Sequence, residues 1–289
     1  MTTSTLKTMV RGAYDLQKLR IMMGNRIVGN FKAKLGQEPG ETEEDGISAE
    51  GKAILSDLRA RYRRLTDGVT TSPRAKQAKF VGDEVISTYT EICLLESYFE
   101  IEKDEANHFK RLVSVLDEYP VWRQFLEPIR GIGPAMGGVI ISEIDIAKAR
   151  HPSSLWKYAG LDVAGDGRGR SRKAEHLVRA AYINKDGEAA ERNSITFNPF
   201  LKTKLIGVLA TSFLRSGNVK YRAIYDGYKH RLENREDWKD EKKGHRNNAA
   251  LRYMIKMFLI DLYTAWRAIE GLPVSVPYHE AKLGYKHAA

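Results

Sequence analysis

Apolar residues recur at helical spacing along most of the chain, and this pattern predicts a mainly α-helical fold. In residues 12–35 the apolar positions lie three or four residues apart with basic residues between them, which is typical of an amphipathic helix. Ser48 is a residue type that caps helices, and it predicts the start of a second helix ending near residue 68. Residues 37–46, between the two helices, are acidic and contain Pro39, which favours a solvated loop. The second helix carries the arginines Arg59, Arg61, Arg63 and Arg64.

The longest periodic stretch is residues 83–118. At about 1.5 Å rise per residue, a single helix of this length would span roughly 54 Å. It is either one extended helix or two helices packed as an antiparallel hairpin, with a break near residues 102–107. Pro120 ends the helix, because its ring cannot donate to the helical hydrogen-bond ladder.

The remainder of the chain predicts shorter helices around one small β-hairpin. Helices are expected after Gly133 and after Pro152, then over residues 200–214, 219–233 and 247–270. Residues 182–184 and 195–197, with Asp186-Gly187 between them, predict the hairpin. We therefore divide the chain into an N-terminal helical region (1–75), a coiled-coil-like helical segment (76–128) and a C-terminal globule (129–289).

Composition narrows the class of partner. Lys and Arg number 47 against 37 Asp and Glu, a formal charge of +10 that would attract polyanions, with nucleic acid the first candidate and a merely soluble basic protein the alternative. Cys93 is the only cysteine, so no intramolecular disulfide or cysteine-based zinc site is expected, which fits a reducing compartment. We see no signal peptide and no membrane-spanning stretch, and we expect a cytoplasmic protein without membrane contacts.

A glycine-rich turn precedes the helix predicted after Gly133. Gly131 and Gly133 alternate with apolar residues, a pattern that in helix-hairpin-helix elements lets the backbone approach a phosphate. The alternative is a tight interhelical turn, in which Gly131, Gly133, Gly137 and Gly138 serve only close packing.

Two basic runs follow the turn. The first is a glycine-rich loop within residues 165–179, where arginine forks could match phosphate oxygens; the alternative is a solvated linker. Its basic residues are Arg168, Arg170, Arg172, Lys173 and Arg179. The second run leads into the last helix, and its alternative is an ordinary charged helix face. Its members are Lys242, Lys243, His245, Arg246, Arg252 and Lys256.

Aromatic residues accompany both basic runs and could stack on unpaired bases, although most of them are expected in the core. They are Trp156, Tyr158, Tyr221, Tyr225 and Tyr228.

Catalysis has less support. A RuvC-like or DEDD nuclease needs carboxylates that begin on an apolar strand, but Asp15 lies in a helical context. An HNH site needs a ββα arrangement, whereas His245 opens a helix and His279 and His287 lie in the tail. Ser171, among arginines, is a weak candidate nucleophile. We expect a binding protein rather than an enzyme, without metal or cofactor.

Residues 129–161 (IRGIGPAMGGVIISEI, then SLWKYAGL) and 243–259 (KGHRNNAALRYMIKMFL) resemble the C-terminal transposase domain of bridge-RNA-guided insertion-sequence transposases. The resemblance covers about 160 residues. Those enzymes carry a RuvC-like domain ahead of this region, which the helical first 120 residues here do not match. Their catalytic serine usually precedes a glycine, whereas Ser171 precedes Arg172.

The same region is similar to the Nop domain of box C/D ribonucleoprotein proteins and to the Tas proteins of TIGR-Tas systems, here the nuclease-free, TasA-like form. This resemblance implies a Nop-like domain at 129–289, preceded by a coiled coil at 83–118. It also implies a homodimer formed through the long helices that binds a guide RNA and presents it to target DNA. The rival hypotheses are a divergent serine recombinase using Ser171 and an architectural DNA-binding protein.

Overall fold

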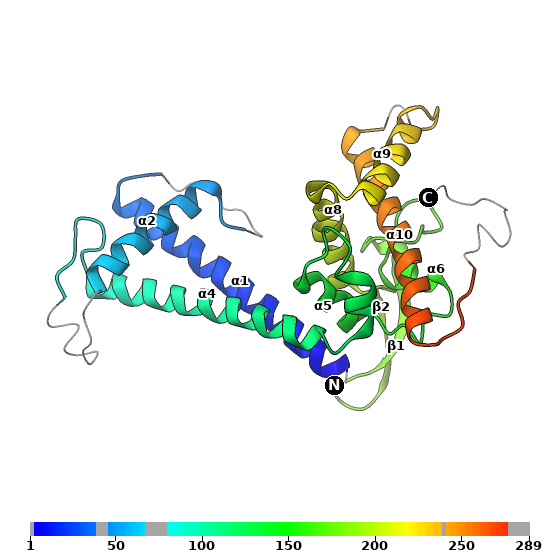
Figure 1. Cartoon of the computed structure of the whole chain (residues 1–289), viewed down its shortest axis with the longest axis horizontal. Coiled ribbons are helices and arrows are strands. Elements are labelled where there is room, and N and C mark those ends of the chain that lie inside the picture. The colour runs from blue at the N-terminus through cyan, green and yellow to red at the C-terminus, as the bar shows by residue number, and fades with distance from the viewer. Residues whose placement is uncertain (1–2, 39–45, 67–79, 239–240, 277–289) are drawn as a thin grey trace. The chain divides into compact units, whose positions relative to one another are not determined.

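The computed structural model describes residues 3–38, 46–66, 80–238 and 241–276, and these are mainly α-helical with one small antiparallel hairpin (Figure 1). The predicted fold class is therefore confirmed. The α-helices are α1 (Thr3–Lys34), α2 (Ala49–Thr66), α4 (Tyr89–Leu116), α5 (Pro134–Glu143), α6 (Pro152–Tyr158), α7 (Pro199–Thr203), α8 (Ala210–Ser216), α9 (Val219–Glu233) and α10 (Lys243–Ile269). Shorter helical segments are η1 (Trp122–Leu126), η2 (Ala174–His176) and η3 (Lys204–Leu209), and the strands are β1 (Val178–Ile183) and β2 (Ala189–Ser194).

The long periodic stretch forms one continuous helix. α4 runs without a break from Tyr89 to Leu116, so the extended helix, not the two-helix hairpin, is the alternative that forms. Ser48 caps α2 as expected, because its Oγ accepts the backbone N–H of Gly51 at 3.0 Å. Most of the predicted loop at 37–46 and the C-terminal histidines His279 and His287 lie outside the described residues.

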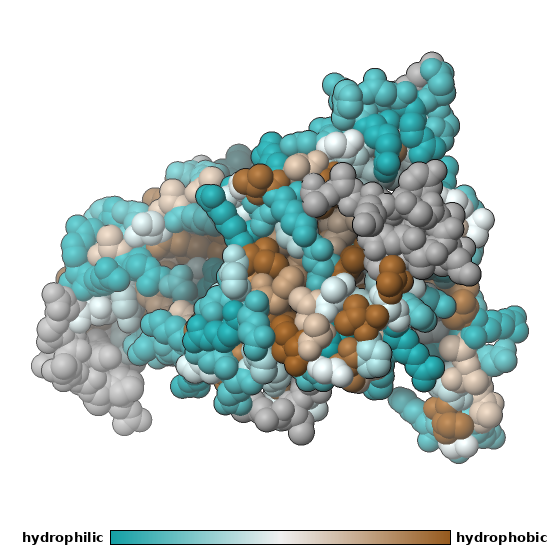
Figure 2. Space-filling view, turned by 45° about the vertical axis from the view of Figure 1, so that its right-hand side comes forward, coloured by the Kyte–Doolittle hydropathy of each residue, from teal (hydrophilic) through white to brown (hydrophobic). Residues whose placement is uncertain are grey.

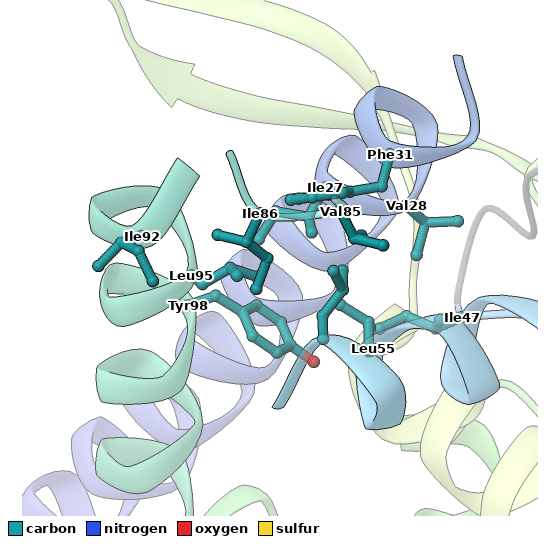
Figure 3. Close-up of a cluster of buried hydrophobic side chains, with 11 residues drawn as sticks. Ile27, Val28, Phe31, Ile47, Leu55, Val85, Ile86, Ile92, Leu95 and Tyr98 are labelled. Atoms are coloured by element: carbon teal, nitrogen blue, oxygen red, sulfur yellow. The ribbon is translucent and has the colours of Figure 1, made fainter. Parts of the chain in front are cut away.

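The chain divides into two compact units, residues 8–112 and residues 1–7 with 113–289. In the first unit, α1, α2 and α4 enclose an apolar core, and Figure 3 shows side chains from all three helices pointing toward one another. Ile27, Leu55 and Leu95 are buried there, one from each helix. Gly24 allows the close approach, because a Cβ at this position would lie 2.7 Å from Ile47 and 3.1 Å from Tyr98.

This core bears on two of the predictions. The predicted N-terminal region and most of the predicted coiled-coil-like segment share one unit, because α2 and α4 contribute to the same core. The apolar stripe of α4, with Ile92, Leu95 and Tyr98 buried, is covered by other helices of the same chain. A homodimer stays a prediction, but this part of the stripe does not require it.

In the second unit, α10 runs through the interior. Met254, Phe258 and Tyr263 are buried on it, and α9 and α6 pack alongside. The predicted helix over 200–214 forms as α7, η3 and α8 in direct succession, with π-helical geometry in the middle. Gly217 ends α8 in the left-handed region, with φ of 66°, and the Asn218 side chain then caps α9.

The predicted hairpin forms, but its second strand was placed wrongly. Asn184 and Gly187 make the turn, Gly187 with φ of 83°, and the strands pair from there, Ile183 opposite Ala189 and Val178 opposite Ser194. The second strand is therefore 189–194 rather than 195–197, and the first, predicted at 182–184, is 178–183. Most of its residues are exposed, so it has no alternating apolar pattern that the sequence could reveal.

Candidate anion-binding site

The distribution of hydrophilic residues over the surface does not single out a site. Figure 2 shows hydrophilic residues over most of the face in view, with hydrophobic residues gathered toward its middle. None of the described helices combines the length and apolar character needed to cross a membrane. A site must therefore be sought in how individual charges are placed.

A pocket of about 570 Å³ in the C-terminal unit collects residues from both predicted basic runs. Its lining comes from residues 161–176, from the end of α9, from residues near 238 and from the first half of α10. Six predicted site residues line it: Arg168, Ser171, Lys173, His245, Arg252 and Lys256.

The helical repeat of α10 brings its contribution together. Arg252 and Lys256 are four residues apart, one turn of helix, so their side chains share a face with Ala249 and Tyr253. Gly169 of the loop lies directly against the Arg252 guanidinium, since a Cβ there would come within 2.4 Å of Cζ. A side chain at position 169 would displace the guanidinium.

Two cations of α10, Arg252 and Lys256, are partly buried and form no ion pair with a carboxylate among the described residues. Within the part of the chain that the structure describes, Arg252 donates to the backbone carbonyls of Gly160 and Asp162, at 3.2 and 3.4 Å. Burial lowers the pKa of its guanidinium, although the Asp162 carboxylate opposes the change. Burial lowers the pKa of Lys256 as well, and repulsion from Arg252 adds to the effect. Among the described residues, the Lys256 ammonium contacts only the ring of Trp156, at 5.3 Å from its centroid.

A third cation, Lys202 of α7, belongs to the same cluster. Burial, together with repulsion from Arg252 and Arg172, lowers its pKa to about 8, although Asp162 opposes the change. Its ammonium donates to the Arg170 carbonyl at 2.5 Å. Three partly buried positive charges therefore share one neighbourhood.

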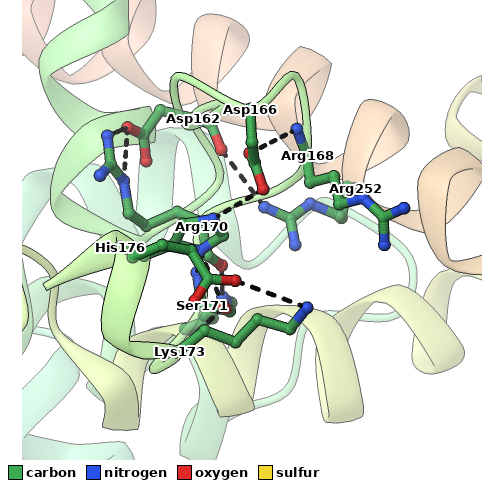
Figure 4. Close-up of polar contacts among 10 residues, drawn as sticks. Asp162, Asp166, Arg168, Arg170, Ser171, Lys173, His176 and Arg252 are labelled. Atoms are coloured by element: carbon green, nitrogen blue, oxygen red, sulfur yellow. Dashed lines mark hydrogen bonds and ion pairs between the residues drawn. The ribbon is translucent and has the colours of Figure 1, made fainter.

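The nearest carboxylate is already engaged. Arg170 holds Asp162 with two hydrogen bonds, at 2.8 and 3.1 Å, so this predicted phosphate ligand is an internal ion-pair partner (Figure 4). Asp162 attracts Arg252, Lys256 and Lys202 electrostatically, but its hydrogen bonds go to Arg170 and none of the three cations forms an ion pair with a carboxylate among the described residues. An anion in the pocket would stabilise these partly buried charges.

Beside these cations lies a hydrogen-bonded chain of three side chains. Ser171 Oγ is 2.8 Å from His176 Nδ1, and His176 Nε2 is 3.1 Å from an Asp166 carboxylate oxygen (Figure 4). His176 is buried, and hydrogen bonds from the Arg168 backbone and from His176 lower the pKa of Asp166. The order serine, histidine, aspartate is that of an activated nucleophile.

The same histidine bears on metal binding. Donor atoms of Asp166, Glu175 and His176 lie within 4.8 Å of one another. However, the Ser171 amide donates to His176 Nδ1 at 3.0 Å, which places the ring proton on Nε2, the nitrogen that faces Asp166. A metal ion on Nε2 would have to displace that proton beside several cations, so we assign no metal here.

Aromatic rings form another wall of the pocket. Tyr228 of α9 and Tyr253 of α10 stack with centroids 4.0 Å apart and an interplanar angle of 14°. Trp238 lies 5.1 Å from the His245 ring. Sequence reasoning named Tyr228 but missed Trp238 and Tyr253. The position of Tyr253 next to Arg252 was the available signal.

The other predicted site residues lie outside this pocket. Gly131, with φ of 102°, packs against α8, where Ser212 Oγ donates to its carbonyl at 2.7 Å and a Cβ would meet Phe213. This geometry is that of the tight packed turn, the alternative to phosphate binding. Gly133 caps the N-terminus of α5. Lys242, Lys243 and Arg246 lie at the start of α10, and Arg172 and Arg179 are exposed.

Tyr221 and Tyr225 are buried, as expected for core aromatic residues, whereas Tyr158 is 40% exposed. Trp156 Nε1 donates to the Lys256 carbonyl at 3.1 Å and so packs α6 against α10.

Comparison of the chain with protein families, with curated proteins and with solved structures finds no match. The site must therefore be interpreted from its own geometry.

Proposed function

We propose that this protein binds RNA through the pocket in its C-terminal unit, as the guide-binding component of an RNA-guided system that targets DNA. The observation that carries the proposal is the pair Arg252 and Lys256, which are partly buried and adjacent without a carboxylate partner among the described residues. Such an arrangement is unfavourable for the free protein and becomes favourable when a phosphate is bound.

The nature of the nucleic acid rests on the resemblance of residues 129–161 and 243–259 to Nop-type and Tas proteins. Under this hypothesis the protein binds the RNA backbone, and base pairing between the RNA and the target selects the DNA. Two copies of the chain form the assembly, which acts in the cytoplasm. The paired Arg170 and the packed Gly131 are not needed as ligands in this proposal.

Sequencing the nucleic acid that co-purifies with the full chain tests the proposal most directly. We expect short RNA of defined sequence, and we expect the double variant Arg252→Gln/Lys256→Gln to lose most of it. With that RNA in solution, the variant should bind roughly 150-fold or more weakly, because each of the two lost charged contacts is worth about 1.5–3 kcal/mol. The slope of log affinity against log salt should fall by roughly 1.4, for two phosphate contacts.

The matched control is Lys148→Gln/Arg222→Gln, which removes the same two kinds of charge from exposed ion pairs of the same unit. It should change affinity less than about threefold. Equal losses in the two double variants would mean that net charge alone attracts RNA. Tight binding of duplex DNA with no RNA recovered would contradict the proposal in favour of an architectural DNA-binding protein.

A second candidate function, transfer of a phosphoryl group to Ser171, is favoured by the Ser171–His176–Asp166 chain. In that reaction Ser171 Oγ forms a bond to phosphorus as the bond to the leaving nucleoside oxygen breaks. The serine proton passes to His176 Nδ1 and then to the leaving oxygen. Against it, the Ser171 amide competes for the same nitrogen lone pair.

A nucleic-acid adduct that survives denaturation would establish this second function. Ser171→Ala should then abolish the adduct and retain RNA binding. If the unaltered protein yields no adduct with the RNA or with DNA complementary to it, Ser171 only shapes the loop.

A further inference from the structure

We infer that the pocket holds one unpaired nucleotide, with its phosphate on Arg252 and Lys256 and its base stacked on Trp238. The inference rests on the proposed RNA binding and adds the class of ligand that the pocket takes. A volume of about 570 Å³ lies within the range of small-ligand pockets. A base within a duplex would have to leave the stack to enter it.

The pocket differs in charge from one end to the other. At the Trp238 end lie two carboxylates that already have partners, Asp237 with Arg235 and Glu241 with His245 at 2.8 Å. Further along α10, roughly 10 Å from His245 at 1.5 Å per residue, lies Arg252. The carboxylates at the Trp238 end have cationic partners, Arg168 also acting on Glu241, whereas Arg252 and Lys256 form no ion pair among the described residues. A nucleotide is therefore oriented with its phosphate toward these two cations of α10.

The aromatic wall suits a base better than an apolar ligand. Trp238 is half-buried, and the stacked rings of Tyr228 and Tyr253 line the same cavity. Arg231 lies 4.6 Å from the Tyr228 ring centroid and holds that ring from outside. The half-buried Trp238 ring lies 5.1 Å from the His245 ring, so it loses little freedom when a base stacks on it, and stacking tolerates every base.

Two probes of equal charge test the inference: a six-nucleotide oligouridylate and a chain of the same length made of abasic ribose phosphates. The unaltered full chain should bind the oligouridylate about tenfold more tightly, since only that probe can stack. In Trp238→Ala this ratio should fall to about one while affinity for the abasic chain is unchanged. Trp238→Tyr should restore most of the ratio, and Arg252→Gln/Lys256→Gln should weaken both probes alike.

Tyr182→Ala is the matched control, because Tyr182 is an exposed aromatic residue of β1 outside the pocket. It should leave the ratio unchanged. Equal binding of the two probes by the unaltered protein would overturn the inference and leave the proposed RNA binding in place, with a backbone-only site. A ratio that survives Trp238→Ala would overturn it too. Failure to bind either probe, or any RNA, would instead refute the proposed function.

Discussion

The basic residues of the N-terminal helical unit differ from two basic residues of the C-terminal pocket in whether they have acidic partners. In residues 8–112, basic side chains of α1 and α2 reach acidic partners: Arg20 contacts Glu105, Arg59 contacts Glu102, and Arg61 contacts Asp57, Asp83 and Glu84. In the C-terminal pocket, Arg252 and Lys256 are partly buried, and the described residues offer neither of them a carboxylate partner.

The number of basic residues in a segment is therefore a poor guide to whether that segment binds an anion. α2 has four arginines within six positions, yet two of them are engaged in ion pairs that hold the helical unit together. Four Lys and Arg residues also line the pocket, but two of them, Arg252 and Lys256, are partly buried without an ion pair among the described residues, and this makes them strong anion ligands. Three predictions follow from this contrast, in order of expected effect.

The largest effect should be a pH dependence of RNA binding that arises at Lys202, which does not line the pocket but interacts electrostatically with Arg252 of its lining. The pKa of Lys202 is lowered to about 8 in the free protein. A bound phosphate favours the charged form and raises that pKa, so binding takes up a proton above this value and affinity falls as pH rises through it. Between about pH 7 and pH 9, RNA affinity should drop about tenfold. The free protein should gain stability from about pH 8 toward the ordinary lysine pKa, because deprotonation relieves a buried charge.

Titration of RNA binding by fluorescence anisotropy across this range measures the effect. Lys202→Arg keeps the positive charge at all these pH values and should flatten the profile. The charged groups around Lys202 are Arg252, Arg172 and Asp162. The same slope in the Lys202→Arg variant would assign the proton to another group.

Periodicity predicted the helices well because their apolar faces are continuous. α4 buries Ile92, Leu95 and Leu112 at helical spacing, and such a face is visible in the sequence. β2 escaped prediction for the opposite reason, since an exposed strand needs no apolar alternation. The apolar stripe of α4 does not distinguish packing against a second copy from packing against helices of the same chain, because both arrangements bury the same residues.

The candidate site was predictable in part. Arg252 and Lys256 stand out as basic residues one helical turn apart, whatever surrounds them. The neutralisation of Arg170 by Asp162 depends on how the loop folds back, and sequence reasoning therefore ranked Arg170 with the free arginines. Trp238 follows a run of acidic residues that argues against an anion site, and only the fold turns its ring toward the pocket.

Stability should change in opposite directions in the two units. Lys256→Met removes a partly buried, unpaired charge and keeps the length of the side chain, so it should raise the free energy of unfolding by about 1 kcal/mol and Tm by about 2–4 °C. Arg20→Met leaves the buried Glu105 without its charged partner and should lower the free energy of unfolding by about 1–3 kcal/mol.

Calorimetry with parallel RNA titrations checks both variants. Lys256→Met should bind RNA more weakly despite its higher Tm, whereas Arg20→Met should bind normally while folded. Destabilisation by both substitutions would show that Lys256 has a stabilising partner in the free protein, and the contrast between the units would disappear.

The smallest effect on RNA affinity should come from substituting Gly169, because this glycine leaves room for the Arg252 guanidinium. A Cβ at this position would lie 2.4 Å from Arg252 Cζ and 2.6 Å from both terminal nitrogens, so Gly169→Ala forces the guanidinium aside. The long arginine side chain can move without disturbing the fold, and we expect Tm within about 2 °C of the unaltered value. RNA affinity should fall about threefold, because the phosphate contact is displaced rather than lost. Gly165→Ala is the matched control in the same loop, since no atom lies within 4 Å of its Cβ position. If the two alanine variants bind RNA equally well, the position of the Arg252 guanidinium does not determine RNA affinity.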